Sequence, residues 1–130
     1  MTRSTGGTKV AARSVGEPAF ANKVTVIVEN VGKSLAAFAL GTDPSTVGRW
    51  ANGKNLPRGL DMERRIENFY KILVFLLDDG TGNPPRSRHE ARSWLMGINP
   101  HLDDTSPAEH IREGKYAPVM AAARAYAAGG

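Results

Sequence analysis

A long amphipathic segment in the middle of the chain restricts the possible folds most strongly. It begins at Leu60 and reads LDMERRIENFYKILVFLLDDG. Its apolar residues recur at alternating spacings of four and three, which is the period of a helix face: Met62, Ile66, Phe69, Leu73 and Leu76. Tyr70 and Leu77 widen this face, and Ile72, Val74 and Phe75 extend beyond it. A helix this apolar is buried on more than one side, in the core, in a dimer contact or in both.

The segments before this helix also favour helices. Apolar residues between 20 and 31 recur at helical spacing: Phe20, Val24, Ile27, Val28 and Val31. The β-branched run from Val24 to Val28 has strand propensity, but the spacing and the stop at Gly32 favour a helix. Ser34 is an expected N-cap for a short helix, LAAFAL, that ends at Gly41. Thr42 or Asp43 caps the next helix, with Pro44 at its first position and Gly53 at its end.

The segments after it carry two helix-start signals. Ser87 with Glu90 and Ser106 with Glu109 form capping boxes, and Pro107 stands at the first position of the second helix. These helices are expected to end at Gly97 and near Gly114, and a last helix is expected to start at Pro118. The sequence therefore predicts an all-α fold: a helix-turn-helix bundle followed by a small helical region.

The composition divides the chain into three parts. Residues 1–17 are rich in Gly, Ser and Thr and predict a flexible arm. Residues 18–80, here the N-terminal half, contain the helical hairpin and the long helix. Residues 81–130, the C-terminal half, follow a loop of turn formers, DDGTGNPP, which predicts a hinge.

The stretch from Asp43 to Pro57, DPSTVGRWANGKNLP, predicts contact with DNA. Two short helices joined by a glycine turn are the pattern of a helix-turn-helix, whose second helix enters the major groove. The expected base-reading positions are Pro44, Ser45, Thr46 and Arg49, whereas Lys33, Ser34, Lys54 and Arg58 are expected to hold phosphates. Val47 and Trp50 are expected to face inward. Chance also produces such hairpins, and the alternative is one that merely packs.

The charge distribution agrees with a DNA partner on one side. The net charge is +4, and residues 1–33 carry five basic and two acidic side chains. Residues 98–130 carry three basic and four acidic side chains. A basic half beside a neutral or acidic one predicts a polyanion partner for the first and another partner for the second.

The two halves resemble one family in the same order. STVGRWANGKNLP resembles the recognition-helix region of the Xre-type (Cro/repressor-like) family. The C-terminal half resembles the toxin-binding domain of Xre/MbcA/ParS-type antitoxins in these features: Ala91, Trp94-Leu95, Asn99-Pro100, Leu102, Ser106-Pro107, Gly114 and the final helix from Val119. The family often has a glycine between the Leu and the Ser/Thr-Pro pair, where this chain has Asp103-Asp104-Thr105.

This resemblance implies the antitoxin of a type II toxin–antitoxin system. Such proteins are cytoplasmic, form homodimers, bind double-stranded operator DNA to repress their own operon, and neutralise a RES-domain toxin that destroys NAD by covering its active site. The residues expected to contact the toxin are Arg112, Lys115, Tyr116, Val119, Met120, Arg124 and Tyr126. For Trp94, core packing is the expected role. A solvated charged surface remains the alternative for each polar residue taken singly.

Nothing in the sequence indicates catalysis, a metal or a cofactor. The three histidines, His89, His101 and His110, lack metal-ligand spacing, and no serine stands in a nucleophile elbow. No apolar run reaches the roughly 20 residues of a membrane span. Two other functions stay open: a stand-alone transcriptional regulator that dimerises through its C-terminal half, and an interaction module whose hairpin does not touch DNA.

Overall fold

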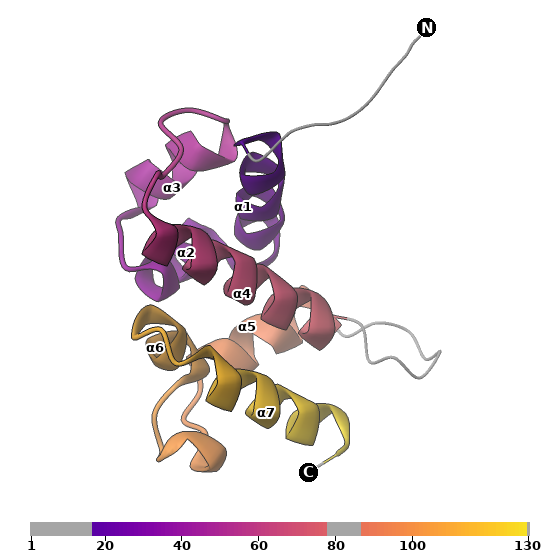
Figure 1. Cartoon of the computed structure of the whole chain (residues 1–130). Helices are drawn as coiled ribbons and strands as arrows, with labels where there is room; N and C mark the ends of the chain where they lie inside the picture. The colour runs from indigo at the N-terminus through magenta and orange to yellow at the C-terminus, as the bar shows by residue number, and fades with distance from the viewer. Residues whose placement is uncertain (1–16, 78–86, 130) are drawn as a thin grey trace, which may run out of the picture.

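The chain folds into helices. The computed structural model describes residues 17–77 and 87–129, with side chains described from residue 20 onward. The helices are α1 (Glu17–Val31), α2 (Lys33–Leu40), α3 (Pro44–Ala51), α4 (Leu60–Leu77), α5 (Arg88–Met96), α6 (Pro107–Arg112) and α7 (Tyr116–Ala127), with a 3-10 turn, η1, at Pro100–Leu102 (Figure 1). Within these ranges the only β pairing is an isolated bridge between Asn99 and Thr105. The prediction of an all-α fold is confirmed.

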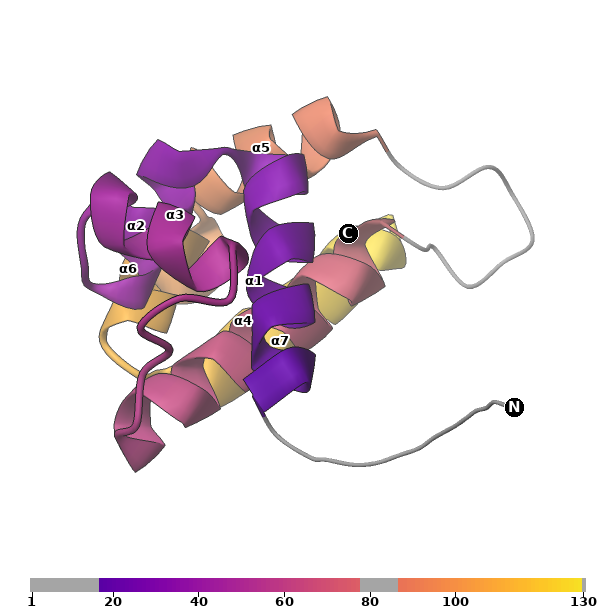
Figure 2. The ribbon, with the colours of Figure 1, turned by 90° about the horizontal axis from the view of Figure 1, so that it is seen from above.

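Helix α4 lies at the centre of the fold. In Figure 1, α1 and α3 lie above it and α6 and α7 lie below, and Figure 2 shows α7 running alongside it. Five of its side chains are almost fully buried: Ile66, Phe69, Ile72, Leu73 and Leu76. Val74, in contrast, is 40% exposed. Burial of Ile72 beside the main stripe explains why the sequence pattern is wider than one helix face.

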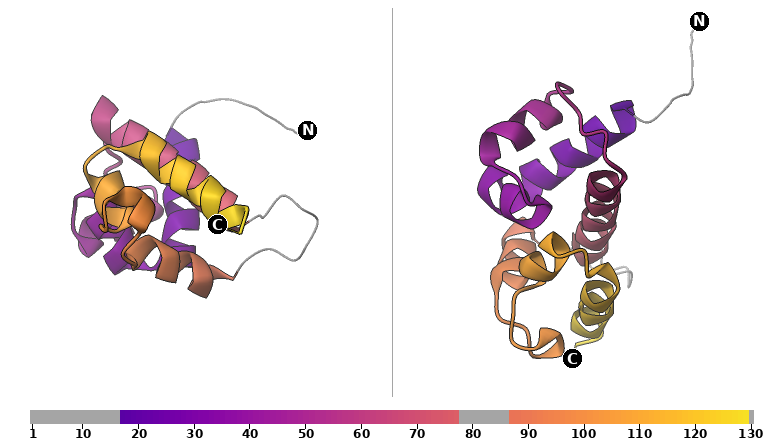
Figure 3. Two further views of the ribbon diagram at one scale, coloured as in Figure 1. Left: turned by 90° about the horizontal axis from the view of Figure 1, so that it is seen from below. Right: turned by 60° about the vertical axis from the view of Figure 1, so that its left-hand side comes forward.

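Side chains from both halves of the chain belong to one hydrophobic core. The cluster includes Val24 and Leu40 of the N-terminal half and Leu95, Ile111 and Val119 of the C-terminal half. Helix α5 contacts α1, and α6 contacts α2, so the two halves also touch away from α4 (Figure 3). The predicted arm and the predicted hinge loop fall outside the described residues, except that Glu17 already belongs to α1.

The predicted helix starts are largely correct, with two exceptions. Ser87 forms the reciprocal capping box with Glu90, and the Ser106 hydroxyl accepts from the Glu109 amide. Ser34 is not an N-cap, because α2 begins two residues earlier than expected, at Lys33, after Gly32 with a φ of +86°. The last helix begins at Tyr116 rather than Pro118, because a proline is tolerated anywhere in the first helical turn, where no amide has a helical partner.

The turn between α2 and α3 depends on Gly41. Its φ of +75° lies in the left-handed region, and its N–H donates to the Phe38 carbonyl oxygen at 3.1 Å. A Cβ at this position would lie 3.1 Å from Nη1 of Arg65, which itself donates to the Leu40 carbonyl oxygen at 3.0 Å. Gly41 is therefore required both by its backbone conformation and by the approach of this guanidinium group.

Gly41→Ala is expected to lower the free energy of unfolding by about 1–2 kcal/mol, the usual cost of the left-handed conformation for an L-residue. Urea denaturation followed by circular dichroism measures it. Gly59→Ala is the matched control, because a Cβ there meets nothing within 4 Å and the φ of Gly59 is not in the left-handed region. Equal effects of the two substitutions would contradict the stated role of Gly41.

Candidate functional site

Helix α3 is held to the core by its inner face. Val47 is fully buried and Trp50 is 7% exposed, as the sequence predicts. The Thr25 hydroxyl of α1 donates to the Ala51 carbonyl oxygen at 2.9 Å, which ties the end of α3 to α1. These contacts fix α3 on α1 and α2, so that its opposite face points to solvent.

The outer face of α3 carries a chain of hydrogen bonds at steps of three residues. The Asp43 carboxylate accepts from the Thr46 amide at 2.8 Å and from the Thr46 hydroxyl at 2.9 Å. The Thr46 hydroxyl oxygen accepts from Nη2 of Arg49 at 3.0 Å. Pro44 and Ser45 are exposed beside it. Sequence reasoning treated Asp43 only as a cap, although residues three apart on a helix are neighbours and the spacing itself indicates the contact.

Asp43 stays ionised on this surface. The Thr46 amide bonded to the Asp43 carboxylate lowers its pKa below the ordinary value, the Thr46 hydroxyl adds to this, and the positive charge of Arg49 acts in the same direction. Because the pKa is lowered on folding, the stabilisation by this cap is complete at pH values above the ordinary pKa of an aspartate. It is lost as the pH falls through the lower pKa of the folded state. At neutral pH the start of α3 therefore carries a full negative charge.

The predicted phosphate-binding residues lie on both sides of α3. Lys33 is exposed, and its Nζ lies 3.5 Å from the place where a Cβ on Gly48 would be, so its side chain reaches over α3. Ser34 is also exposed, within the first turn of α2 rather than at its cap. Lys54 and Arg58 are exposed in the loop that follows α3. Of these residues, Lys33 lies against α3 and the Lys54 amide donates to the Arg49 carbonyl oxygen at 2.8 Å, whereas Ser34 lines a pocket formed with α5 and α6.

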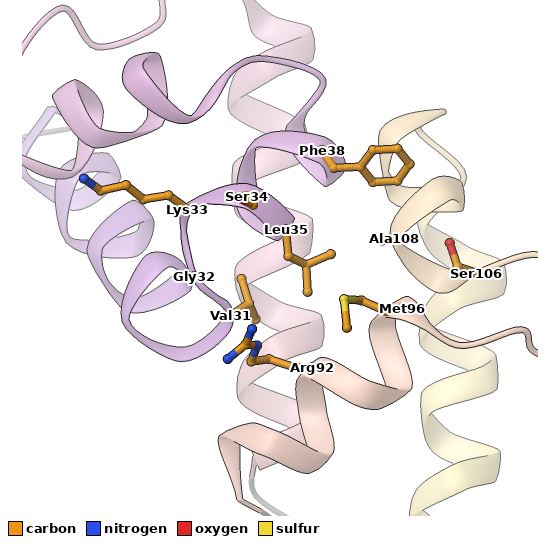
Figure 4. A pocket seen from close by; sticks show the side chains of 10 residues that line it. All are labelled: Val31, Gly32, Lys33, Ser34, Leu35, Phe38, Arg92, Met96, Ser106 and Ala108. Carbon is orange, nitrogen blue, oxygen red and sulfur yellow. The ribbon is translucent and has the colours of Figure 1, made fainter.

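A shallow pocket of about 510 Å³ lies where α2 faces α5 and α6. Leu35, Phe38 and Met96 line it together with Arg92, and in Figure 4 Lys33 extends away from the other lining side chains. Phe38 and Met96 are 41% and 55% exposed. The exposure of these apolar residues could not be predicted from the sequence, because helical spacing alone does not distinguish a core position from a surface position at the edge of the core.

Two of the predicted partner-contact residues have structural roles in the fold. Val119 is fully buried in the core, so its side chain is not available to a partner. Arg112 donates from Nη1 to the Phe38 carbonyl oxygen at 3.1 Å, and its guanidinium lies 5.0 Å from the centre of the Phe38 ring. It therefore links α6 to α2 while remaining exposed. The remaining predicted contacts stay at the surface: Lys115 and Arg124 are exposed, and Tyr116, Met120 and Tyr126 are half-buried.

Aromatic packing occupies the far end of the C-terminal half. The rings of Trp94 and Tyr126 lie 5.8 Å apart, and a pocket of about 330 Å³ is lined by these two residues and by Ile98, which is 76% exposed. Trp94 packs against the core, as expected, but only partly buried. Ile98 is a surface residue that the sequence analysis missed.

The backbone at Asp103-Asp104 has a conformation that glycine adopts easily. Both residues are left-handed, with φ values of +55° and +59°. Aspartate tolerates this conformation better than most residues, although glycine adopts it more easily. The loop is closed by the Asn99 amide, which donates to the Thr105 carbonyl oxygen at 3.0 Å, and the Thr105 hydroxyl lies 2.9 Å from Nδ1 of His110.

Among residues 17–77 and 87–129, no three acidic, histidine or cysteine side chains come together in a way that could hold a metal ion. None of the helices described here has the length and apolar character needed to cross a membrane.

The fold and these surfaces define a small all-α protein in which a two-helix hairpin and a helical C-terminal half share one core. The mycobacterial cidal antitoxin MbcA is 28% identical over 117 residues in Mycobacterium tuberculosis (strain H37Rv) and in Mycobacterium bovis, covering 88% of this chain and 97% of MbcA. In the crystal structure of the M. tuberculosis MbcT–MbcA toxin–antitoxin complex, the matched chain is 24% identical, with a TM-score of 0.64 over 84% of this chain and 94% of that one. No protein-family model matches the chain. The chain is homologous to MbcA, and the resemblance seen in the sequence is confirmed.

Proposed function

We propose that this chain is the antitoxin of a type II toxin–antitoxin system. The observation that carries the proposal is the extent of the similarity: it covers 88% of this chain and 97% of MbcA, and so includes both the hairpin and the C-terminal half.

The hairpin supports DNA binding as the regulatory activity. Its second helix carries exposed Ser45 and Arg49 and half-buried Thr46, and Lys33 and Arg58, which precede and follow this helix in the sequence, are exposed as well. Arginine forks onto a guanine edge in the major groove, and lysine or arginine beside it neutralises phosphates. We propose that α2 and α3 act as an Xre-type helix-turn-helix, that the antitoxin binds its own operator as a homodimer, and that it represses its operon in the cytoplasm.

The C-terminal half supports binding of the toxin. The proposed partner is a RES-domain toxin that degrades NAD, and the proposed contact surface consists of Arg112, Lys115, Tyr116, Met120, Arg124 and Tyr126. Tyrosine and arginine are enriched among the residues that dominate binding energy. The relatives are named as antitoxins rather than enzymes, and the proposal assigns the chain no catalytic activity.

The toxin partner is tested by co-expression with the adjacent open reading frame. We expect the two proteins to copurify, and we expect cells to lose NAD and viability when only the neighbour is expressed. Tyr126→Ala combined with Arg124→Ala is expected to weaken copurification, whereas Lys71→Ala on exposed α4 surface serves as the control. A harmless neighbour that does not bind would leave a stand-alone regulator as the function.

The DNA-binding half is tested by Arg49→Ala on a duplex taken from upstream of the gene. Loss of one bidentate guanine contact costs about 1–3 kcal/mol, so we expect operator affinity to fall about 5- to 150-fold. Arg92→Ala removes an equal charge from α5 and is the matched control. Fluorescence anisotropy at fixed salt measures both. If Arg49→Ala binds the operator as tightly as the wild type, the hairpin does not read DNA through α3.

A further inference from the structure

A chain of hydrogen bonds joins Asp43 through Thr46 to Arg49, although Asp43 is not among the DNA contacts proposed above. We propose that Asp43 is a positioning and specificity-determining residue: it holds Arg49 through Thr46 and turns the start of α3 toward a G·C base pair rather than a phosphate. This inference rests on the proposed DNA-binding function. Its three links are all between 2.8 and 3.0 Å long.

The Arg49 side chain is conformationally restricted before DNA binds. An exposed arginine carries about 2 kcal/mol of rotamer entropy, which is lost when it binds one base in one geometry. The bond from Nη2 to the Thr46 hydroxyl already restricts the side chain before DNA arrives. Guanidinium has five N–H donors, so donors remain for O6 and N7 of a guanine. Asp43 orients the Thr46 hydroxyl by accepting a hydrogen bond from it, which leaves the oxygen lone pairs toward Arg49.

The N-terminus of α3 is already occupied by a carboxylate, that of Asp43. A helix N-terminus usually favours an anion, and a phosphate group is the common occupant in a DNA complex. Here the Asp43 carboxylate takes that place by accepting from the Thr46 amide. Its negative charge repels a phosphate, while a carboxylate oxygen accepts from the amino group of cytosine. The ligand this arrangement fits is therefore a major groove with guanine opposite Arg49 and a cytosine amino group within reach of Asp43.

Three variants separate this task from helix capping. Asp43→Asn keeps an oxygen that can accept from the Thr46 amide but removes the charge. Thr46→Val keeps the shape of the side chain and removes the hydroxyl, and Thr46→Ser restores the hydroxyl. Asp61→Asn removes an equal charge from an exposed position in the first turn of α4 and is the matched control.

The measured quantity is the ratio of affinities for the upstream operator duplex and for a mixed-sequence duplex of the same length, at two salt concentrations. We expect Asp43→Asn to bind the mixed-sequence duplex more tightly and to lose at least about fivefold of this ratio. Thr46→Val is expected to lose a similar factor without tighter mixed-sequence binding, because no charge changes. Thr46→Ser is expected to recover part of the ratio that Thr46→Val loses, Asp61→Asn is expected to keep the wild-type ratio, and thermal melting checks that every variant is folded.

The outcomes distinguish this inference from the proposed function. If the wild type prefers its operator and both Asp43→Asn and Thr46→Val keep the full ratio, the positioning task is overturned while DNA reading stands. If the wild type itself shows no preference, sequence reading by α3 is overturned and the positioning task with it. A loss of ratio in Asp61→Asn equal to that in Asp43→Asn would show a general charge effect and would also overturn the inference.

Discussion

Trp50→Ala is expected to lower the free energy of unfolding by about 3–5 kcal/mol, the usual cost of removing a large aromatic side chain from a core. Trp50 is 7% exposed, and it lies on the face of α3 that packs against α1 and α2. Because α3 has only eight residues, it has little helical stability of its own and depends on this contact. Urea denaturation followed by far-UV circular dichroism measures the loss.

The same substitution is expected to weaken operator binding as well, because α3 loses the side chain that fixes its inner face on α1 and α2. Met96→Ala is the control, because Met96 is 55% exposed and its removal is expected to change stability by no more than about 0.5 kcal/mol. A small effect of Trp50→Ala on unfolding would show that the inner face of α3 does not contribute to the core.

Phe69→Ala is likewise expected to lower the free energy of unfolding by about 3–5 kcal/mol. The side chain is fully buried in α4, which contacts both α1 and α7. Since the two halves share one core, we expect a single unfolding transition that moves as a whole to lower denaturant concentration. The transition is followed by circular dichroism and, separately, by the fluorescence of the two tryptophans.

Val74→Ala on the same helix is the matched control, with Val74 40% exposed and an expected change near zero. If Phe69→Ala separates the signal of the N-terminal half from that of the C-terminal half, the two are independent folding units. That result would contradict the single core.

Much of the helical fold can be predicted from local sequence patterns. The four-three spacing in α4 predicts its buried face because each of those positions meets a neighbouring helix, and the caps at Ser87 and Ser106 act within one turn. The start of α2 could not be placed in the same way. A glycine with positive φ gives no polar side-chain signal, so Ser34 was the more visible candidate.

The candidate site was predictable where it depends on position along a helix and not where it depends on distant contacts. Val47 and Trp50 follow from spacing. The burial of Val119 and the contact of Arg112 with Phe38 join residues far apart in the sequence, and no local pattern encodes such pairs. The Ala-rich last helix made this harder, because small side chains leave little contrast between its inner and outer faces.

The contacts at the end of α2 have a consequence for exchanging parts between relatives. The Phe38 carbonyl oxygen accepts from Arg112 of α6, and the Leu40 carbonyl oxygen accepts from Arg65 of α4. Gly41 caps the first helix of the hairpin locally, and these two bonds add donors from other segments of the chain. A chimera that transplants residues 33–51 into another scaffold loses both bonds unless that scaffold supplies an arginine in each of these two places. Whether the hairpin can be transferred to another scaffold thus depends in part on residues that lie away from its outer face.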